Sequence, residues 1–131
     1  MKVNNKWLVI LMLAAALPLS GCGFISKLRA RDSLNKGVRA FTEQKYDQAA
    51  GFFEEAIRLD PDFQVARMYL ATTYTSQFVP GSPDPKSNEM ADKAIKTFEE
   101  VLTTEKSGIP NINAMLSIAS LYYQLRKYDE S

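Results

Sequence analysis

The sequence predicts an all-α fold in which antiparallel helical hairpins stack side by side, after an N-terminal targeting segment. Three observations lead to this prediction. No segment after residue 22 shows the strict alternation of apolar and polar residues that marks a half-buried strand. Small, aromatic and alanine residues recur at similar spacings in two successive stretches, which indicates an internal repeat. Prolines follow these stretches at Pro61 and Pro110, where a helix would end.

The first twenty-one residues have the layout of a secretory signal peptide. Lys2 and Lys6 supply the positive charge, and the uninterrupted apolar run from Trp7 to Leu17 follows them. This run is about half of the roughly twenty residues that a helix needs to cross a bilayer. We therefore expect a cleaved signal peptide over residues 1–21 rather than a permanent transmembrane helix.

A four-residue motif ends this segment, and it consists of Leu19, Ser20, Gly21 and Cys22. The motif resembles the lipobox of bacterial lipoproteins, in which the cysteine thiol receives a diacylglyceryl group and cleavage occurs just before it. The resemblance implies that Cys22 becomes the lipidated N-terminus and that its acyl chains, such as palmitate, hold the protein on a membrane. Gly23 stands where an Asp often retains such proteins in the inner membrane, which favours the outer membrane facing the periplasm. The alternative is an ordinary secretory signal with a coincidental cysteine.

Residues 22–29 are interpreted as a tether, and residues 30–63 as the first helical hairpin. The hairpin carries a spaced set of small, aromatic and proline residues, namely Gly37, Tyr46, Ala49, Phe53, Ala56 and Pro61. This spacing resembles the tetratricopeptide repeat, a pair of antiparallel helices. The resemblance implies a short solenoid over residues 30–131, in which Gly37 faces Ala49 so that the two backbones approach closely. The aromatic side chains are expected to fill the core around that contact.

Residues 64–111 form a second, longer unit. Its matching residues are Leu70, Ala71 and Tyr74 on the first helix, and Ala94 and Phe98 on the second. About eleven residues are added between its helices, and three prolines with a glycine predict a loop at 76–88. Ser87 or Asn88 is expected to cap the helix after this loop. Asp62 and Asn111 are expected to cap the helices that follow the prolines.

Residues 112–131 form a partial third unit that begins with Ile118, Ala119 and Tyr122, includes Tyr128 and stops at Ser131. Its second helix is absent from the sequence, so we expect apolar residues of its first helix to be uncovered. They are Ile118, Leu121, Tyr122 and Leu125. Further repeats beyond Ser131, or homo-oligomerisation through this unit, are the two expectations that follow.

Composition argues against most chemical functions. Lys and Arg number 16 against 15 Asp and Glu, so no nucleic-acid partner is implied. Histidine is absent and Cys22 is the only cysteine, which removes the commonest ligands of zinc and haem. Ser33 and Lys36 match the S-x-x-K motif of serine acyl-enzymes, but the partner motifs of that class are missing. We expect no enzyme activity, no metal and no cofactor.

Protein binding is the remaining expectation. In tetratricopeptide arrays, residues of the first helices line a concave face that holds a partner helix or extended peptide. The corresponding positions here are Leu34, Val38, Phe41, Val65, Met68, Thr72, Thr75, Leu116 and Tyr123. We therefore expect a membrane-anchored scaffold or assembly factor for other proteins in the bacterial cell envelope. The alternative is an envelope lipoprotein with a small-molecule pocket inside the curve of the repeats, covered by the proline-rich loop.

Overall fold

The part of the chain that the structure describes is all-helical, as the sequence predicts. The computed structural model describes the backbone of residues 21–129 and the side chains of residues 23–126. Within these residues there are five α-helices and no strand. The helices are α2 (Gly21–Thr42), α3 (Tyr46–Leu59), α4 (Gln64–Gln77), α5 (Pro85–Thr104) and α6 (Ile112–Asp129).

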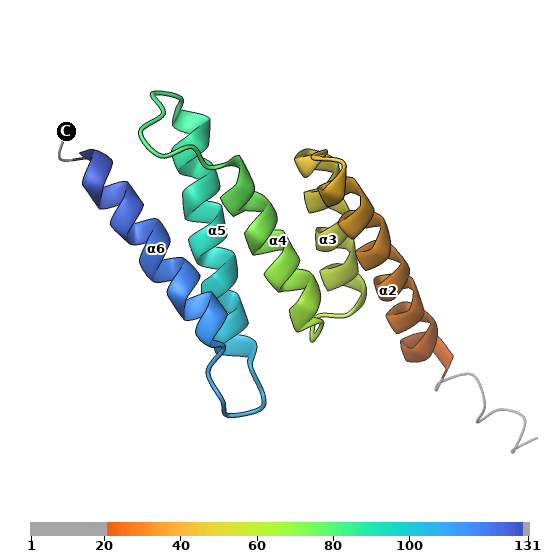
Figure 1. Cartoon of the computed structure of the whole chain (residues 1–131). Coiled ribbons are helices and arrows are strands. Elements are labelled where there is room, and N and C mark those ends of the chain that lie inside the picture. Colours follow the sequence, from red (N-terminus) through yellow and green to blue (C-terminus); the bar gives the residue numbers. More distant parts are fainter. Residues whose placement is uncertain (1–20, 130–131) are drawn as a thin grey trace, which may run out of the picture.

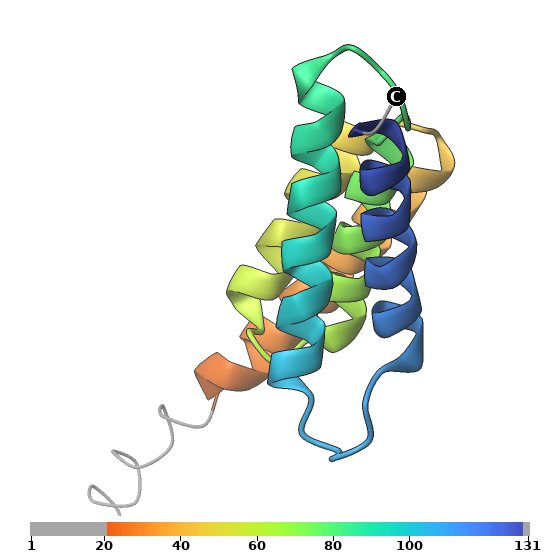
Figure 2. The same ribbon diagram turned by 90° about the vertical axis from the view of Figure 1, so that its left-hand side faces the viewer.

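The helices form a row in chain order, each antiparallel to the one before it (Figure 1). Every helix packs against its neighbours in the sequence, and α2 also contacts α4. Figure 2 shows the row as two layers, with α4 and α6 on one side and α3 and α5 on the other. Because short links join successive helices, nearly all packing forms between segments that are close in the chain.

Two apolar clusters fill the space between the layers. The first lies between α2, α3 and α4, and its buried members are Ala40, Ala49, Ala50, Phe53 and Leu70. The second joins α4, α5 and α6 and the start of the loop after α4, and its buried members are Ala71, Phe78, Met90, Ala91, Ala94, Ile95, Phe98, Val101, Ala114 and Leu121. Tyr74 packs against both clusters, so the two hairpins share a continuous interior.

The close approach of α2 and α3 occurs at Gly37. We expected Gly37 to face Ala49, but the atoms nearest to the space beside it belong to the ring of Phe53. A Cβ placed on Gly37 would lie 2.5 Å from Cε1 of Phe53. The ring of Phe53 is fully buried and stacks on Tyr69 of α4, with ring centroids 5.3 Å apart. The glycine therefore makes room for an aromatic ring that joins three helices.

The segment expected as a tether, residues 22–29, is part of α2. Ala30 is buried, and the hydroxyl of Ser26 donates a hydrogen bond to the carbonyl of Leu59 at the end of α3. One side of the first turns is therefore packed against the array. Of the motif residues before it, Leu19 and Ser20 lie outside the described residues, whereas Gly21 and Cys22 begin the helix.

The proline-rich insertion forms a loop that is shorter than predicted. It runs over residues 78–84, because α4 continues to Gln77 and α5 already begins at Pro85. The expected cap at Ser87 or Asn88 is wrong: Asp84 caps α5 and accepts a hydrogen bond from the backbone of Lys86. The backbone N–H at the first helical position has no acceptor within the helix, so a proline, which lacks this donor, is tolerated there. The helix therefore begins at Pro85. Ser87 instead binds Val79 across the loop.

Of the other two residues that we expected to cap a helix, one does so and the other does not. Asn111 caps α6, because its side-chain oxygen accepts a hydrogen bond from the backbone nitrogen of Ala114 at 3.1 Å. Asp62 does not cap α4, whose N-cap residue is Phe63 without a side-chain hydrogen bond. The carboxylate of Asp62 instead accepts a hydrogen bond from Lys106 at 2.7 Å, which ties the α3–α4 link to the α5–α6 loop.

The helix of the partial third unit, α6, is only partly uncovered. Leu121 is buried and Ile118 and Leu125 are half-buried against the second cluster, so the expectation that these three lack cover is wrong. They face the cluster shared with α5 because they lie one helical turn apart on the same side. Tyr122 is exposed, in agreement with the expectation. The side chain of Tyr128, and Ser131, lie outside the described residues.

Candidate protein-binding face

The predicted binding residues belong to α2, α4 and α6, which lie at the front of Figure 1. We call the solvent-facing surface of these three helices the open face. The other layer, α3 and α5, lies behind it (Figure 2). The structure therefore groups the predicted residues on one layer, but their exposure differs between helices.

The contribution of α2 is mainly packing. Leu34, Val38 and Phe41 are half-buried and pack against the first cluster. The ring of Phe41 meets the ring of Tyr46 edge-on, with centroids 5.5 Å apart. Most of the apolar surface of these three predicted binding residues is therefore buried inside the protein. A partner would contact only the part that remains exposed.

The middle helix, α4, carries both exposed and half-buried predicted residues. Val65 and Thr72 are exposed, whereas Met68 and Thr75 are half-buried. The hydroxyl of Thr72 donates to the carbonyl of Met68 at 2.8 Å, as expected for a threonine inside a helix. Thr75 bonds Ala71 in the same way at 3.0 Å. Both hydroxyls already donate within their own helix, so they present a methyl group and an acceptor oxygen to a partner.

The first turns of α4 border a surface hollow of about 280 Å³. Its lining combines three predicted residues with three that sequence reasoning missed, and consists of Gln64, Val65, Met68, Tyr69, Thr72 and Asn111. The side-chain amide nitrogen of Gln64 donates to Thr104 at the end of α5, at 2.7 Å. Its side-chain oxygen is buried without a hydrogen-bond partner among the described residues. The hollow therefore lies where α4, α5 and the start of α6 meet.

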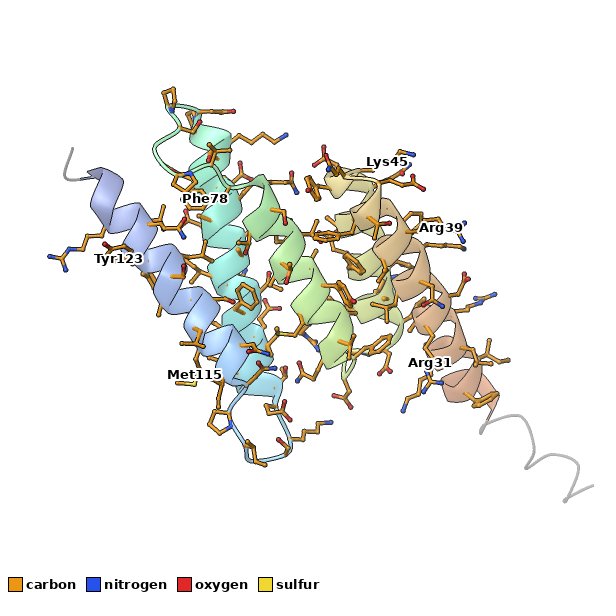
Figure 3. The ribbon with its side chains drawn as sticks, viewed as in Figure 1. Arg31, Arg39, Lys45, Phe78, Met115 and Tyr123 are labelled. Carbon is orange, nitrogen blue, oxygen red and sulfur yellow. The ribbon has the colours of Figure 1, made fainter. Side chains whose placement is uncertain are left out.

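On α6, Leu116 and Tyr123 are exposed by 63% and 69%, which is more than the 49% of Val65 on α4. Neither lines the hollow beside α4. Figure 3 shows Tyr123 and Met115 on the last helix of the row, at the opposite end from Arg31 on α2. The structure therefore brings the α4 residues together but leaves those of α6 as a neighbouring exposed patch.

A second hollow lies beside the α5–α6 loop, and sequence reasoning missed it. Its volume is about 400 Å³, and it is lined by Leu102, Glu105, Gly108, Ile109, Pro110 and Met115. Ile109 and Met115 are exposed on this side. The loop turns at Gly108, whose positive φ of 72° suits glycine. The only sequence signal for this hollow was the Gly-Ile-Pro turn itself, which indicates a bend but not a cavity.

The proline-rich loop has a hollow of its own, of about 260 Å³. It is lined by the apolar side chains of Val79 and Met90 and by five polar or charged residues, namely Gln77, Ser82, Asp84, Lys86 and Ser87. It lies at the end of α4 and α5 rather than inside the row of helices (Figure 1). This hollow is open to solvent at the end of the α4–α5 hairpin.

The pKa values of Asp62 and Tyr74 are shifted, each for an identifiable reason. The hydrogen bond from Lys106 holds the pKa of Asp62 below its usual value. Burial, together with the hydrogen bond that its hydroxyl donates to Glu54 at 2.8 Å, raises the pKa of Tyr74. Tyr74 packs against both core clusters, while the pair of Asp62 and Lys106 is exposed at the surface.

The S-x-x-K pair does not form a site. Ser33 is buried in α2, whereas the ammonium group of Lys36 is exposed and pairs with Asp32 at 2.7 Å. The two side chains therefore have different surroundings, although residues three apart are neighbours on a helix surface. No group of three or more metal-ligating side chains occurs in the part of the chain that the structure describes.

Within residues 21–129, no helix has the length and apolar character that crossing a membrane requires. Comparison of the sequence with models of known families and with curated protein sequences finds no match. The geometry of the chain's own residues is therefore the basis of the functional proposal.

Proposed function

We propose that this chain is a lipid-anchored array of tetratricopeptide-type hairpins that holds another protein at a bacterial cell envelope. The open face binds the partner, and no step of catalysis is involved. The observation that carries the proposal is the exposure of Val65, Leu116 and Tyr123 on one layer of helices, beside a hollow of about 280 Å³. Exposed apolar side chains grouped on one surface are typical of protein-binding sites.

The arrangement of the helices supports the repeat interpretation. The α2–α3 and α4–α5 hairpins are antiparallel and follow one another in a row, as stacked repeats do (Figure 1). Phe53 and Phe98 are buried at equivalent positions of the two hairpins, and so are Ala49 and Ala94. Among the described residues, α6 alone represents a third unit.

The shape of the open face favours a helix or an extended peptide as partner. Its middle helix offers a shallow hollow that is open at the surface, and its last helix offers flat aromatic and aliphatic surface. From Ile112 to Leu125, α6 carries no charged side chain. The partner segment would therefore be largely apolar on the side that meets α6, because a charged group buried there would lose its hydration without a counter-charge.

The anchor part of the proposal rests on the lipobox and is tested by Cys22→Ser. We expect the full-length wild-type chain, expressed in a bacterium, to gain the mass of acyl chains and to move to the envelope fraction. Without the thiol no thioether can form, so the variant should keep its leader or lose it without acylation. Intact mass spectrometry and membrane fractionation measure both properties. An unmodified wild type would refute the lipid anchor and leave the fold unaffected.

The binding part is tested by site-specific photo-crosslinking in cells that express the full chain. A photoreactive amino acid at Leu116 or at Tyr123 should give discrete cross-linked products, because these side chains lie on the proposed interface. The matched control is Lys96, which is exposed on α5 in the other layer. We expect Leu116→Glu to remove the products formed from position 123. If position 96 gives the same products, or if the open-face positions give none, the scaffold proposal is refuted.

A further inference from the structure

The first turns of α2 have a second apolar side that points away from the array. Phe24, Ile25 and Leu28 are exposed by 67%, 54% and 48%. On a helix with 3.6 residues per turn, these three positions share one face. The side occupied by Ser26, Ala30 and Ser33 is the one that packs inward. Neither cluster of the core therefore uses this apolar surface.

Basic residues flank the apolar side. Lys27, Arg29 and Arg31 are all exposed, and residues 23–31 contain no acidic side chain. Among the described residues, none of these three cations forms an ion pair. The acids around them are paired with other cations: Glu55 with Arg58 at 2.6 Å and Asp62 with Lys106 at 2.7 Å. Asp32, which follows Arg31 in the chain, pairs with Lys36 at 2.7 Å. The segment therefore offers three positive charges around an apolar strip, which we call the α2 patch (Phe24, Ile25, Lys27, Leu28, Arg29 and Arg31).

The position of the α2 patch in the chain indicates its occupant. It begins two residues after Cys22, and the apolar run of residues 7–17 precedes that cysteine. Whether the chain is held by acyl chains or by this run, the patch lies next to the lipid. A helix with an apolar side and a basic border lies in the plane of an anionic membrane surface, because apolar side chains enter the acyl boundary while cations meet the headgroups.

We propose that the α2 patch binds the surface of an anionic lipid bilayer. The inference rests on the envelope location of the proposed function, but not on acylation itself. Its consequence is a fixed orientation of the protein relative to the membrane. A chain held by its end alone would rotate freely about the attachment, whereas a helix lying against the bilayer fixes the direction of α2 and of the row packed against it (Figure 3). The open face would then be presented in one direction relative to the membrane.

The test places a tryptophan in the α2 patch and measures whether lipid reaches it. The full chain carries Cys22→Ser, to exclude acylation, and Trp7→Phe, to remove its only tryptophan. Phe24→Trp is the reporter, and Val79→Trp is the control, because Val79 is exposed by 59% and belongs to the α4–α5 loop at the other end of the molecule (Figure 1). Each variant is mixed with vesicles of phosphatidylcholine alone or of phosphatidylcholine and phosphatidylglycerol. The acyl chains of these lipids are brominated, so they quench the fluorescence of a tryptophan that reaches them.

We expect the emission of the tryptophan at position 24 to shift to shorter wavelength on anionic vesicles and to be quenched several-fold more than that at position 79. Residues 1–21 have the same sequence in both variants, so the difference reports local contact. Charge reversal by Lys27→Glu, Arg29→Glu and Arg31→Glu should abolish the excess quenching, and neutral vesicles should reduce it. These sites are exposed, and circular dichroism checks that the fold is retained.

Two results would overturn the inference. If quenching at position 24 is the same on neutral vesicles and after charge reversal, the tryptophan is near lipid only because the leader is attached to it. If its emission is already shifted without vesicles and does not respond to them, residues 1–20 or a second copy of the chain cover the patch. Neither result bears on acylation or on cross-linking at the open face, so the proposed function is tested separately.

Discussion

The substitution Phe53→Ala is expected to lower the free energy of unfolding by about 3–5 kcal/mol. The ring of Phe53 is fully buried, fills the space beside Gly37 and stacks on Tyr69, so its removal leaves a cavity where three helices meet. Chemical denaturation followed by far-UV circular dichroism measures the effect. A loss of this size is a large part of the roughly 5–15 kcal/mol that typically stabilises a domain.

The neighbouring phenylalanine provides the matched control for this experiment. Phe52 lies on the same helix but is only half-buried, at the edge of the first cluster. Phe52→Ala should therefore lower the free energy of unfolding clearly less than Phe53→Ala does. Equal losses from the two substitutions would contradict the placement of Phe53 at the centre of the α2–α3–α4 contact.

Gly37→Ala is expected to destabilise the fold although alanine is the better helix former. Its Cβ would lie 2.5 Å from Cε1 of Phe53, and overpacking of this kind costs about 1–3 kcal/mol. Replacing a glycine in the middle of a helix by alanine stabilises the helix by about 1 kcal/mol. The free energy of unfolding, measured by denaturation, should therefore still decrease. Gly51→Ala is the control, since nothing lies within 4 Å of its added Cβ, and it should stabilise the fold.

The double variant separates the steric explanation from others. When Phe53→Ala has removed the ring, the three atoms nearest to the Cβ at position 37 are gone. Gly37→Ala should then stabilise that background, which reverses the sign of its effect. If it destabilises both backgrounds by the same amount, the contact between Gly37 and Phe53 is not the reason that glycine occupies this position.

Much of the fold could be predicted because its information is local. The spacing of Gly37, Phe53 and Pro61 is visible in the sequence, and prolines and glycine mark the links. The structure confirms the all-helical class and the loop before α5. The helix start at Pro85 could not be predicted with the same rule, because both Asp84 and Ser87 are good capping residues, and only the bond between Ser87 and Val79 shows which one is engaged elsewhere.

The candidate site was harder to predict from the sequence than the fold. A position on the first helix of a repeat indicates which layer a residue belongs to, but not how far its neighbours cover it. Phe41 is half-buried because Tyr46 folds back against it, while Tyr123 is exposed because no described helix follows α6. Tyr69 borders the hollow although its ring stacks on Phe53, a double role that no spacing rule indicates.

The closure of the proline-rich loop by Ser87 has a practical consequence. The Ser87 hydroxyl accepts a hydrogen bond from the backbone nitrogen of Val79 at 2.8 Å and donates one to its carbonyl at 3.0 Å. These bonds join the two ends of the loop below its tip, and Pro80 and Gly81 at the tip are exposed. Lengthening a loop closed in this way is inexpensive, at about 0.6 kcal/mol for each doubling of length. An epitope or a fluorescent domain inserted after Gly81 would extend from the end opposite the start of α2, leaving the helix row intact for imaging in living cells.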